Sequence, residues 1–101
     1  MADINRIAAT YQQSADKTTS ATPSTATAMV ATSLITEQAI FYADAGNTAN
    51  IVIGPTSAGT LYSVAAGQWF LIEPKGGRPV DLATWYVKSS AASQTYRIEY
   101  L

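Results

Sequence analysis

The 101-residue chain contains neither cysteine nor histidine. Without cysteine, disulfide scaffolds, cysteine-based zinc sites and thiol catalysis are excluded. Without histidine, the Ser-His-Asp triad and the most common general base near neutral pH are excluded as well. We therefore expect no catalytic residue, no cofactor and no metal ligand, and we expect the protein not to be an enzyme.

Charge is also scarce. Charged residues make up 13% of the chain, with six basic and seven acidic side chains and a net charge of −1. This balance gives nucleic acids and anionic membranes little electrostatic reason to bind. The longest apolar runs, such as residues 69–72, fall far short of the roughly 20 residues that a membrane-spanning helix needs. From the charge balance and these short runs, we expect neither nucleic acid nor membrane as a partner. The N-terminus lacks the pattern of a signal peptide, so we expect synthesis in the cytoplasm.

Large apolar side chains are fewer than the hydrophobic content of 48% suggests, because alanine alone supplies 18 residues. Serine and threonine together supply another 22. A chain of this length forms one small core that buries only about two-thirds of its unfolded surface.

The N-terminal residues have the spacing of an amphipathic helix. Ile4, Ile7, Ala8 and Tyr11 follow the i, i+3, i+4, i+7 pattern, which predicts a short helix over residues 3–14. A helix this short is marginal in water unless it packs on something. We therefore expect Ile4, Ile7 and Tyr11 to form a face that docks on a partner.

The next segment, residues 15–33, has a low-complexity composition in which 14 of 19 residues are Ala, Ser or Thr. Pro23 blocks a helix through it, and so little apolar area does not offset the entropy lost on ordering. We expect residues 1–33 to form a helix and an extended arm, disordered alone or ordered against a partner. Thr22, Pro23 and Thr25 are the predicted partner-binding residues of this arm, whose removal should leave a folded β-domain.

Residues 34–101 alternate large apolar residues with turn residues. This pattern predicts an all-β domain, a small antiparallel β-sandwich or jelly-roll-like unit, although strand spacing alone leaves a barrel open as well. Period-two alternation is clearest in the last strand, where Tyr96, Ile98 and Tyr100 share one face. The predicted strands cover residues 37–43, 50–53, 60–64, 68–73, 81–88 and 94–101.

Two glycine-containing loops have both a functional and a purely structural interpretation. Gly54 and Gly59 have the separation of a phosphate-binding loop, but Thr60 and Leu61 stand where that loop needs Lys and Ser or Thr, so a hairpin loop is favoured. Residues 75–78 place Lys75 and Arg78 around two glycines, which suits an anion-binding backbone nest or, preferably, a tight turn. We include both cations among the predicted partner-binding residues, facing an acidic neighbouring subunit.

Acidic and aromatic residues give weaker indications. No pair of the seven carboxylates can be placed at the spacing that a glycosidase needs, and Asp44 with Asn47 offers too few oxygen ligands for calcium. Trp69–Phe70 and Trp85–Tyr86 would suit a sugar-stacking platform. Because neighbouring residues on a strand point to opposite faces, we expect one ring of each pair to enter the core or an interface.

From Asn47 onward the chain resembles small virion proteins of tailed bacteriophages, of the head decoration or cement type. The matching pieces are Asn-Thr-Ala-Asn-Ile-Val-Ile-Gly (47–54), Gly-Thr-Leu (59–61), Ala-Gly-Gln (66–68), Asp-Leu (81–82), Trp-Tyr-Val-Lys (85–88), Ser-Ser-Ala-Ala-Ser (89–93) and Tyr-Arg-Ile-Glu-Tyr-Leu (96–101). The resemblance lies in the rhythm of strands and turns over residues 36–101 and carries no active residue. It implies a small β-domain that decorates a capsid, or one that belongs to a tail or fibre.

Physical arguments favour the same function. A β-domain of about 65 residues has marginal stability as a monomer, and its sheet edges must be paired or covered. A low-complexity arm can become ordered by binding along the surface of a neighbouring subunit. We therefore expect a protein on the capsid surface of the virion that clamps adjacent copies of the major capsid protein and forms a homo-oligomer, preferably a trimer. The alternative is a tail or fibre component that binds a host glycan through Trp69, Trp85 or Tyr86.

Overall fold

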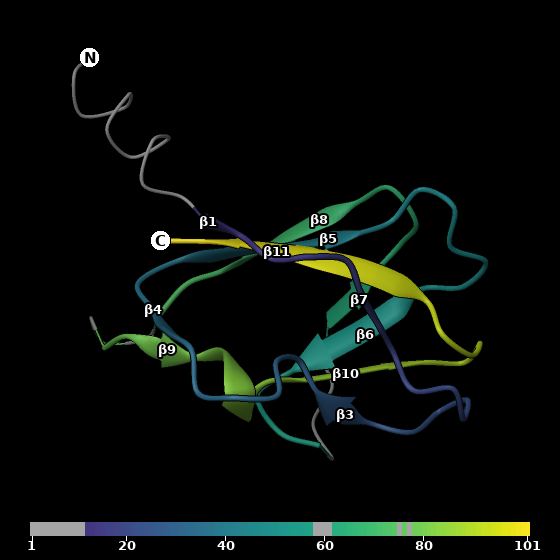
Figure 1. Cartoon of the computed structure of the whole chain (residues 1–101), viewed down its shortest axis with the longest axis horizontal. Helices are drawn as coiled ribbons and strands as arrows, with labels where there is room; N and C mark the ends of the chain where they lie inside the picture. The colour runs from purple at the N-terminus through teal and green to yellow at the C-terminus, as the bar shows by residue number, and fades with distance from the viewer. Residues whose placement is uncertain (1–11, 58–61, 75, 77) are drawn as a thin grey trace.

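Antiparallel β-sheets build the part of the chain that a computed structural model describes, which is residues 12–57, 62–74, 76 and 78–101 (Figure 1). A five-stranded sheet has the order β1-β11-β5-β8, with β2 also pairing with β11. A four-stranded sheet has the order β3-β10-β6-β7, and β4 pairs with β9. The expectation of an all-β fold is therefore confirmed.

The elements are mostly short. In chain order they are β1 (Gln12–Gln13), β2 (Lys17–Thr18), β3 (Thr27–Ala28), β4 (Ile35–Thr36), β5 (Ala39–Ala43), β6 (Ile51–Gly54), β7 (Tyr62–Val64), β8 (Trp69–Ile72), β9 (Val80–Asp81), the 3₁₀ turn η1 (Leu82–Thr84), β10 (Tyr86–Ser89) and β11 (Thr95–Tyr100).

Five of the six predicted strands correspond to one observed strand each, and the prediction for residues 81–88 is wrong in its continuity. That segment is β9, η1 and β10, because Asp81 caps η1 by accepting a 3.0 Å hydrogen bond from the Ala83 N–H. The same carboxylate accepts hydrogen bonds from the Leu34 N–H and the Ser33 hydroxyl. A short polar side chain that binds nearby backbone favours a turn over a continuous strand.

Alternation along the strands places the core between the two larger sheets. In β5, Ala39, Phe41 and Ala43 are buried, and Phe41 stacks on Tyr96 of β11 with ring centroids 5.0 Å apart. The four-stranded sheet contributes its own buried set, which consists of Ile51, Ile53, Val64 and Val87. The predicted shared face of Tyr96, Ile98 and Tyr100 is thus confirmed, since the first two are buried and Tyr100 packs against the core.

The arm differs from its expected behaviour. Residues 15–33 lie against the chain's own sheets, since β2 pairs with β11 and β3 pairs with β10. Met29 and Val30 are buried in the core, exposed by only 1% and 7%. The physical reason is that burial of two large apolar side chains and a set of backbone hydrogen bonds offset the entropy lost on ordering this segment. The Ala, Ser and Thr content of the segment does not reveal these contacts.

The predicted helix over residues 3–14 falls mostly on residues 1–11, which lie outside the described residues. Its last part is wrong, because Gln12 and Gln13 form β1 and pair with Tyr100 and Glu99. The Tyr100 hydroxyl also meets the Gln12 side-chain carbonyl at 3.2 Å. The chain therefore enters the described region at the outer edge of the five-stranded sheet.

Candidate functional site

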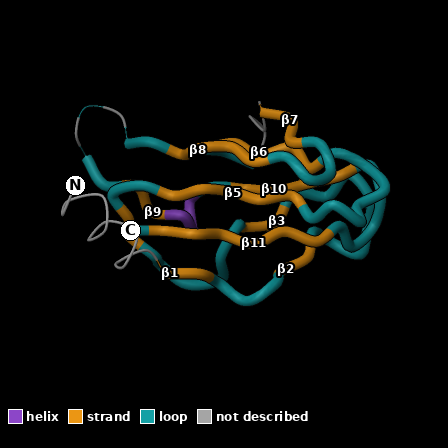
Figure 2. Tube along the Cα trace, turned by 90° about the horizontal axis from the view of Figure 1, so that it is seen from above, coloured by secondary structure: helices purple, strands orange, loops and turns teal. Residues whose placement is uncertain are grey.

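The two lateral sides of the β-domain are covered differently. On one side, β1 and β2 flank β11 while β3 flanks β10, so the chain between them passes from one sheet to the other and covers that side (Figure 2). On the other side, β8 ends the five-stranded sheet and β7 ends the four-stranded sheet. Among the described residues no further strand pairs with either of these two edges. Exposed edges and the gap between them are where a sheet protein accepts a partner.

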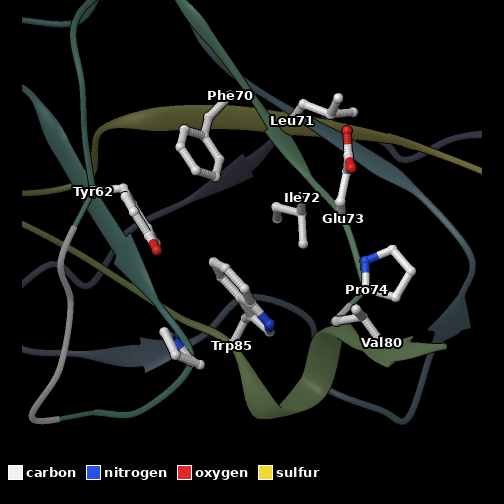
Figure 3. A pocket seen from close by; sticks show the side chains of 9 residues that line it. Tyr62, Phe70, Leu71, Ile72, Glu73, Pro74, Val80 and Trp85 are labelled. Atoms are coloured by element: carbon white, nitrogen blue, oxygen red, sulfur yellow. The ribbon is translucent and has the colours of Figure 1, made fainter. Parts of the chain in front are cut away.

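A groove of about 530 Å³ opens on this side, between β7 and β8 (Figure 3). Rings line one part of it: Tyr62 stacks on Phe70 with centroids 4.7 Å apart and lies 6.4 Å from the Trp85 ring. Ile72 and Val80 continue the apolar lining. The volume and the predominantly apolar lining fall within the range of known ligand pockets.

Strand register explains why these rings converge. Tyr62 pairs with the buried Ile53 and Phe70 pairs with the buried Phe41, so both rings point into the space between the sheets. Both strands end their sheets, so the two rings lie at the rim of the core. Trp85 follows η1 directly and its N–H donates to the Leu82 carbonyl at 3.2 Å.

A second aromatic feature lies on the outer face of the five-stranded sheet. Trp69, which is 60% exposed, is directly opposite Tyr42, which is in turn opposite Arg97. The Arg97 guanidinium carbon is 5.0 Å from the Tyr42 ring centroid, a cation–π geometry. The Arg97 Nε is buried and has no hydrogen-bond partner among the described residues. Two rings and a cation therefore form a row across three strands.

The expected split of neighbouring aromatic residues is confirmed for the first pair, in which Trp69 is exposed and Phe70 faces inward. Trp85 lines the groove, and Tyr86 pairs with Gly54 in the four-stranded sheet. The three residues considered for a sugar platform, Trp69, Trp85 and Tyr86, are thus not brought together. Tyr42, the actual neighbour of Trp69, was missed, although its place in the predicted strand over residues 37–43 put it on a sheet face.

The predicted partner-binding residues lie in separate places. Ile4, Ile7, Tyr11 and Lys75 are outside the described residues. Thr22, Pro23 and Thr25 are exposed in the connection between β2 and β3. The preceding Ser20 accepts a hydrogen bond from the Ser93 N–H, two residues before β11 begins.

Arg78 is exposed in the connection between β8 and β9. β9 pairs with β4, and the Thr36 hydroxyl of β4 donates to the carbonyl of Leu101, just beyond the end of β11. The loop that carries Thr22, Pro23 and Thr25, called the arm loop below, therefore lies near one end of β11. Arg78 lies near the other end. Six residues of strand span about 17 Å, so one small partner group cannot touch both.

The predicted turns are partly confirmed. Gly76 has a φ of +65°, the left-handed backbone expected for the turn between β8 and β9. The Asp44 carboxylate accepts a 2.9 Å hydrogen bond from the Gly46 N–H, as expected of a turn-forming residue. Gly54 closes β6, while residues 58–61 of the glycine loop lie outside the described residues.

Chemistry at other places is limited. In residues 12–57, 62–74, 76 and 78–101, no three acidic side chains cluster closely enough to hold a metal ion. Over the same residues, no helix is long and apolar enough to cross a membrane. Comparison of the chain with protein-family models, with curated proteins and with solved structures gave no match.

Proposed function

We propose that this chain is a structural virion protein of a tailed bacteriophage, which decorates or cements the capsid by clamping adjacent subunits of the major capsid protein. Its domain would be a small β-sandwich or jelly-roll-like unit on the capsid surface, made in the host cytoplasm. It would act as a homo-oligomer, preferably a trimer. The proposal starts from the resemblance of residues 36–101 to such proteins.

One observation carries the proposal furthest. The exposed loop with Thr22, Pro23 and Thr25 and the exposed Arg78 lie near opposite ends of β11. A protein that clamps two neighbours needs two separated contact surfaces on one rigid body. Because the arm is hydrogen-bonded to both larger sheets, a pull on the arm loop is transmitted to the whole domain.

The sides of the domain support the same interpretation. The groove between β7 and β8 is apolar and the strands on either side of it are sheet edges, which are surfaces suited to protein partners. A protein that holds two adjacent capsid subunits together needs a complementary surface and apolar contact area, and it needs no reactive side chains. A chain without histidine or cysteine can perform that role.

The test is binding to purified capsids of the same phage that lack this protein. We expect Thr25→Asp and Arg78→Glu each to weaken capsid binding at least about tenfold, because each removes one end of the clamp. Normal capsid binding by both end variants, with the fold intact, would contradict the clamp.

A second candidate is a tail or fibre component that binds a host surface glycan. The observation in its favour is the row of Trp69, Tyr42 and Arg97, where two rings could stack on sugar faces and the guanidinium could bind hydroxyl groups. Loss of glycan-array binding in Trp69→Ala, with retention in Trp69→Phe, would support it. Absence of glycan binding by the unaltered protein would reject it.

A further inference from the structure

The two sides of the domain suggest how copies of this chain bind one another. The chain covers one side with its own residues 14–28, whereas nothing in the described residues covers the groove between β7 and β8. An apolar groove at a sheet edge is a binding surface for an amphipathic segment. The question is which segment fits.

The N-terminal segment of the sequence is amphipathic. Residues 1–11 lie outside the described residues, and in sequence they carry Ile4, Ile7 and Tyr11 at helical spacing. Two isoleucines and a tyrosine are chemically matched to a groove lined by rings and aliphatic side chains.

The point at which this segment joins the domain decides which groove it can reach. Gln12 pairs with Tyr100, which pairs with Ala39, which pairs with Ile72 of the groove. Three strand spacings separate Gln12 from Ile72, which amounts to about 14 Å. Residue 11 is bonded to Gln12, with about 3.8 Å between the Cα atoms, so Tyr11 cannot enter the groove of its own chain and the three side chains cannot fill that groove together.

We infer that the groove between β7 and β8 binds the N-terminal segment of a second copy of the chain, with Ile4, Ile7 and Tyr11 against Tyr62, Phe70 and Val80. The donor segment leaves from β1 and the receiving groove adjoins β8, which are opposite edges of the five-stranded sheet. The contact is therefore head to tail, and repetition closes a ring or continues along a surface. This inference deepens the proposed structural role and rests on it only for its biological setting.

Self-association of the purified full-length chain tests the inference, measured by sedimentation over a range of concentrations. Ile7→Asp places a charge on the donor face, and Tyr62→Asp places one in the groove. Each should weaken self-association at least about tenfold, because a charge is costly to bury in an apolar site. Ala9→Asp, about 200° around a helix from Ile7, and Ser63→Asp, adjacent to Tyr62 on the other strand face, are the matched controls and should associate normally.

Mixing the two defective variants gives the decisive result. Ile7→Asp keeps an intact groove and Tyr62→Asp keeps an intact donor segment, so the mixture should form a one-to-one dimer that grows no further. A monomeric unaltered protein, unchanged association of both variants or failure of the mixture to pair would each overturn the inference. Circular dichroism of each variant confirms that a loss does not come from unfolding.

The failure of this inference is distinguishable from failure of the proposed function. Capsid binding by a protein that stays monomeric would reject the head-to-tail contact and leave the capsid role standing. One-to-one pairing of the variants without any capsid binding would support the contact and reject the capsid role.

Discussion

The hydroxyl of Tyr96 donates a 2.8 Å hydrogen bond to the backbone carbonyl of Met29. Tyr96 lies in β11 of the five-stranded sheet, and Met29 directly follows β3 at the edge of the four-stranded sheet. Both residues are almost completely buried. This bond fastens the arm to the centre of the domain.

Replacing Tyr96 by phenylalanine should lower the free energy of unfolding by about 1–3 kcal/mol, because the Met29 carbonyl keeps its burial and loses its partner. Urea unfolding followed by circular dichroism measures the change. Tyr42→Phe is the control, since Tyr42 lies on the outer face of the sheet. Equal stabilities of the two variants would contradict the role of the bond.

We also expect the ionisation of Tyr96 to make the stability of the fold depend on pH in the alkaline range. Burial raises the pKa of Tyr96 from 10.0 to about 12. The folded state therefore retains the proton while the unfolded state loses it, so the contribution of Tyr96 is complete below pH 10 and is lost as the pH rises toward 12. Unfolding of the normal protein and of Tyr96→Phe between pH 9 and 12 should show a smaller pH dependence in the variant.

Truncating Met29 tests whether the arm contributes to the core. Met29→Ala should lower the free energy of unfolding by about 2–5 kcal/mol, the usual range for a large side chain removed from a packed interior. Thr25→Ala, in the exposed part of the same arm, should stay within about 0.5 kcal/mol of the unaltered protein. A negligible effect of Met29→Ala would mean that the arm is not part of the cooperative fold.

We expect the ionisation of Asp81 to make the stability of the fold depend on pH in the acidic range. Hydrogen bonds from Ser33, Ala83 and Leu34 hold the pKa of its carboxyl below the usual 3.8. The contribution of Asp81 is therefore complete above that value and is lost as the pH falls through the lowered pKa. Thermal unfolding of Asp81→Asn between pH 5 and 2 should be less pH-dependent than that of the unaltered protein, and equal pH profiles would count against this role.

Strands and their faces were predictable from the sequence because alternation reports burial directly, as it does for β5 and β11. The two-residue strands β1–β4 were not, since pairs such as Thr27–Ala28 carry no periodicity and are fixed by the sheets they join. The arm's only large side chains in the core are those of Met29 and Val30, and its backbone pairs with β10 and β11. Deleting residues 1–33 would therefore remove two core side chains as well as the arm, whereas deleting residues 1–11 removes none of the described residues.

The candidate site was predictable only in part. Phe70 and Trp85 were recognised as possible interface rings, but the groove depends on strand order, which places β7 and β8 on the same side of the domain. Sequence spacing does not encode that order. Tyr62 lines the groove only because β7 and β8, which belong to different sheets, are edge strands on the same side of the domain.

The proposed role of the chain is to join neighbouring subunits on a capsid. Electron microscopy of virions, reconstructed with and without this protein, tests it most directly. We expect additional density on the capsid surface that bridges adjacent major capsid subunits and has the size of the β-domain. Density confined to the tail or fibres, or no difference between the two reconstructions, would contradict it.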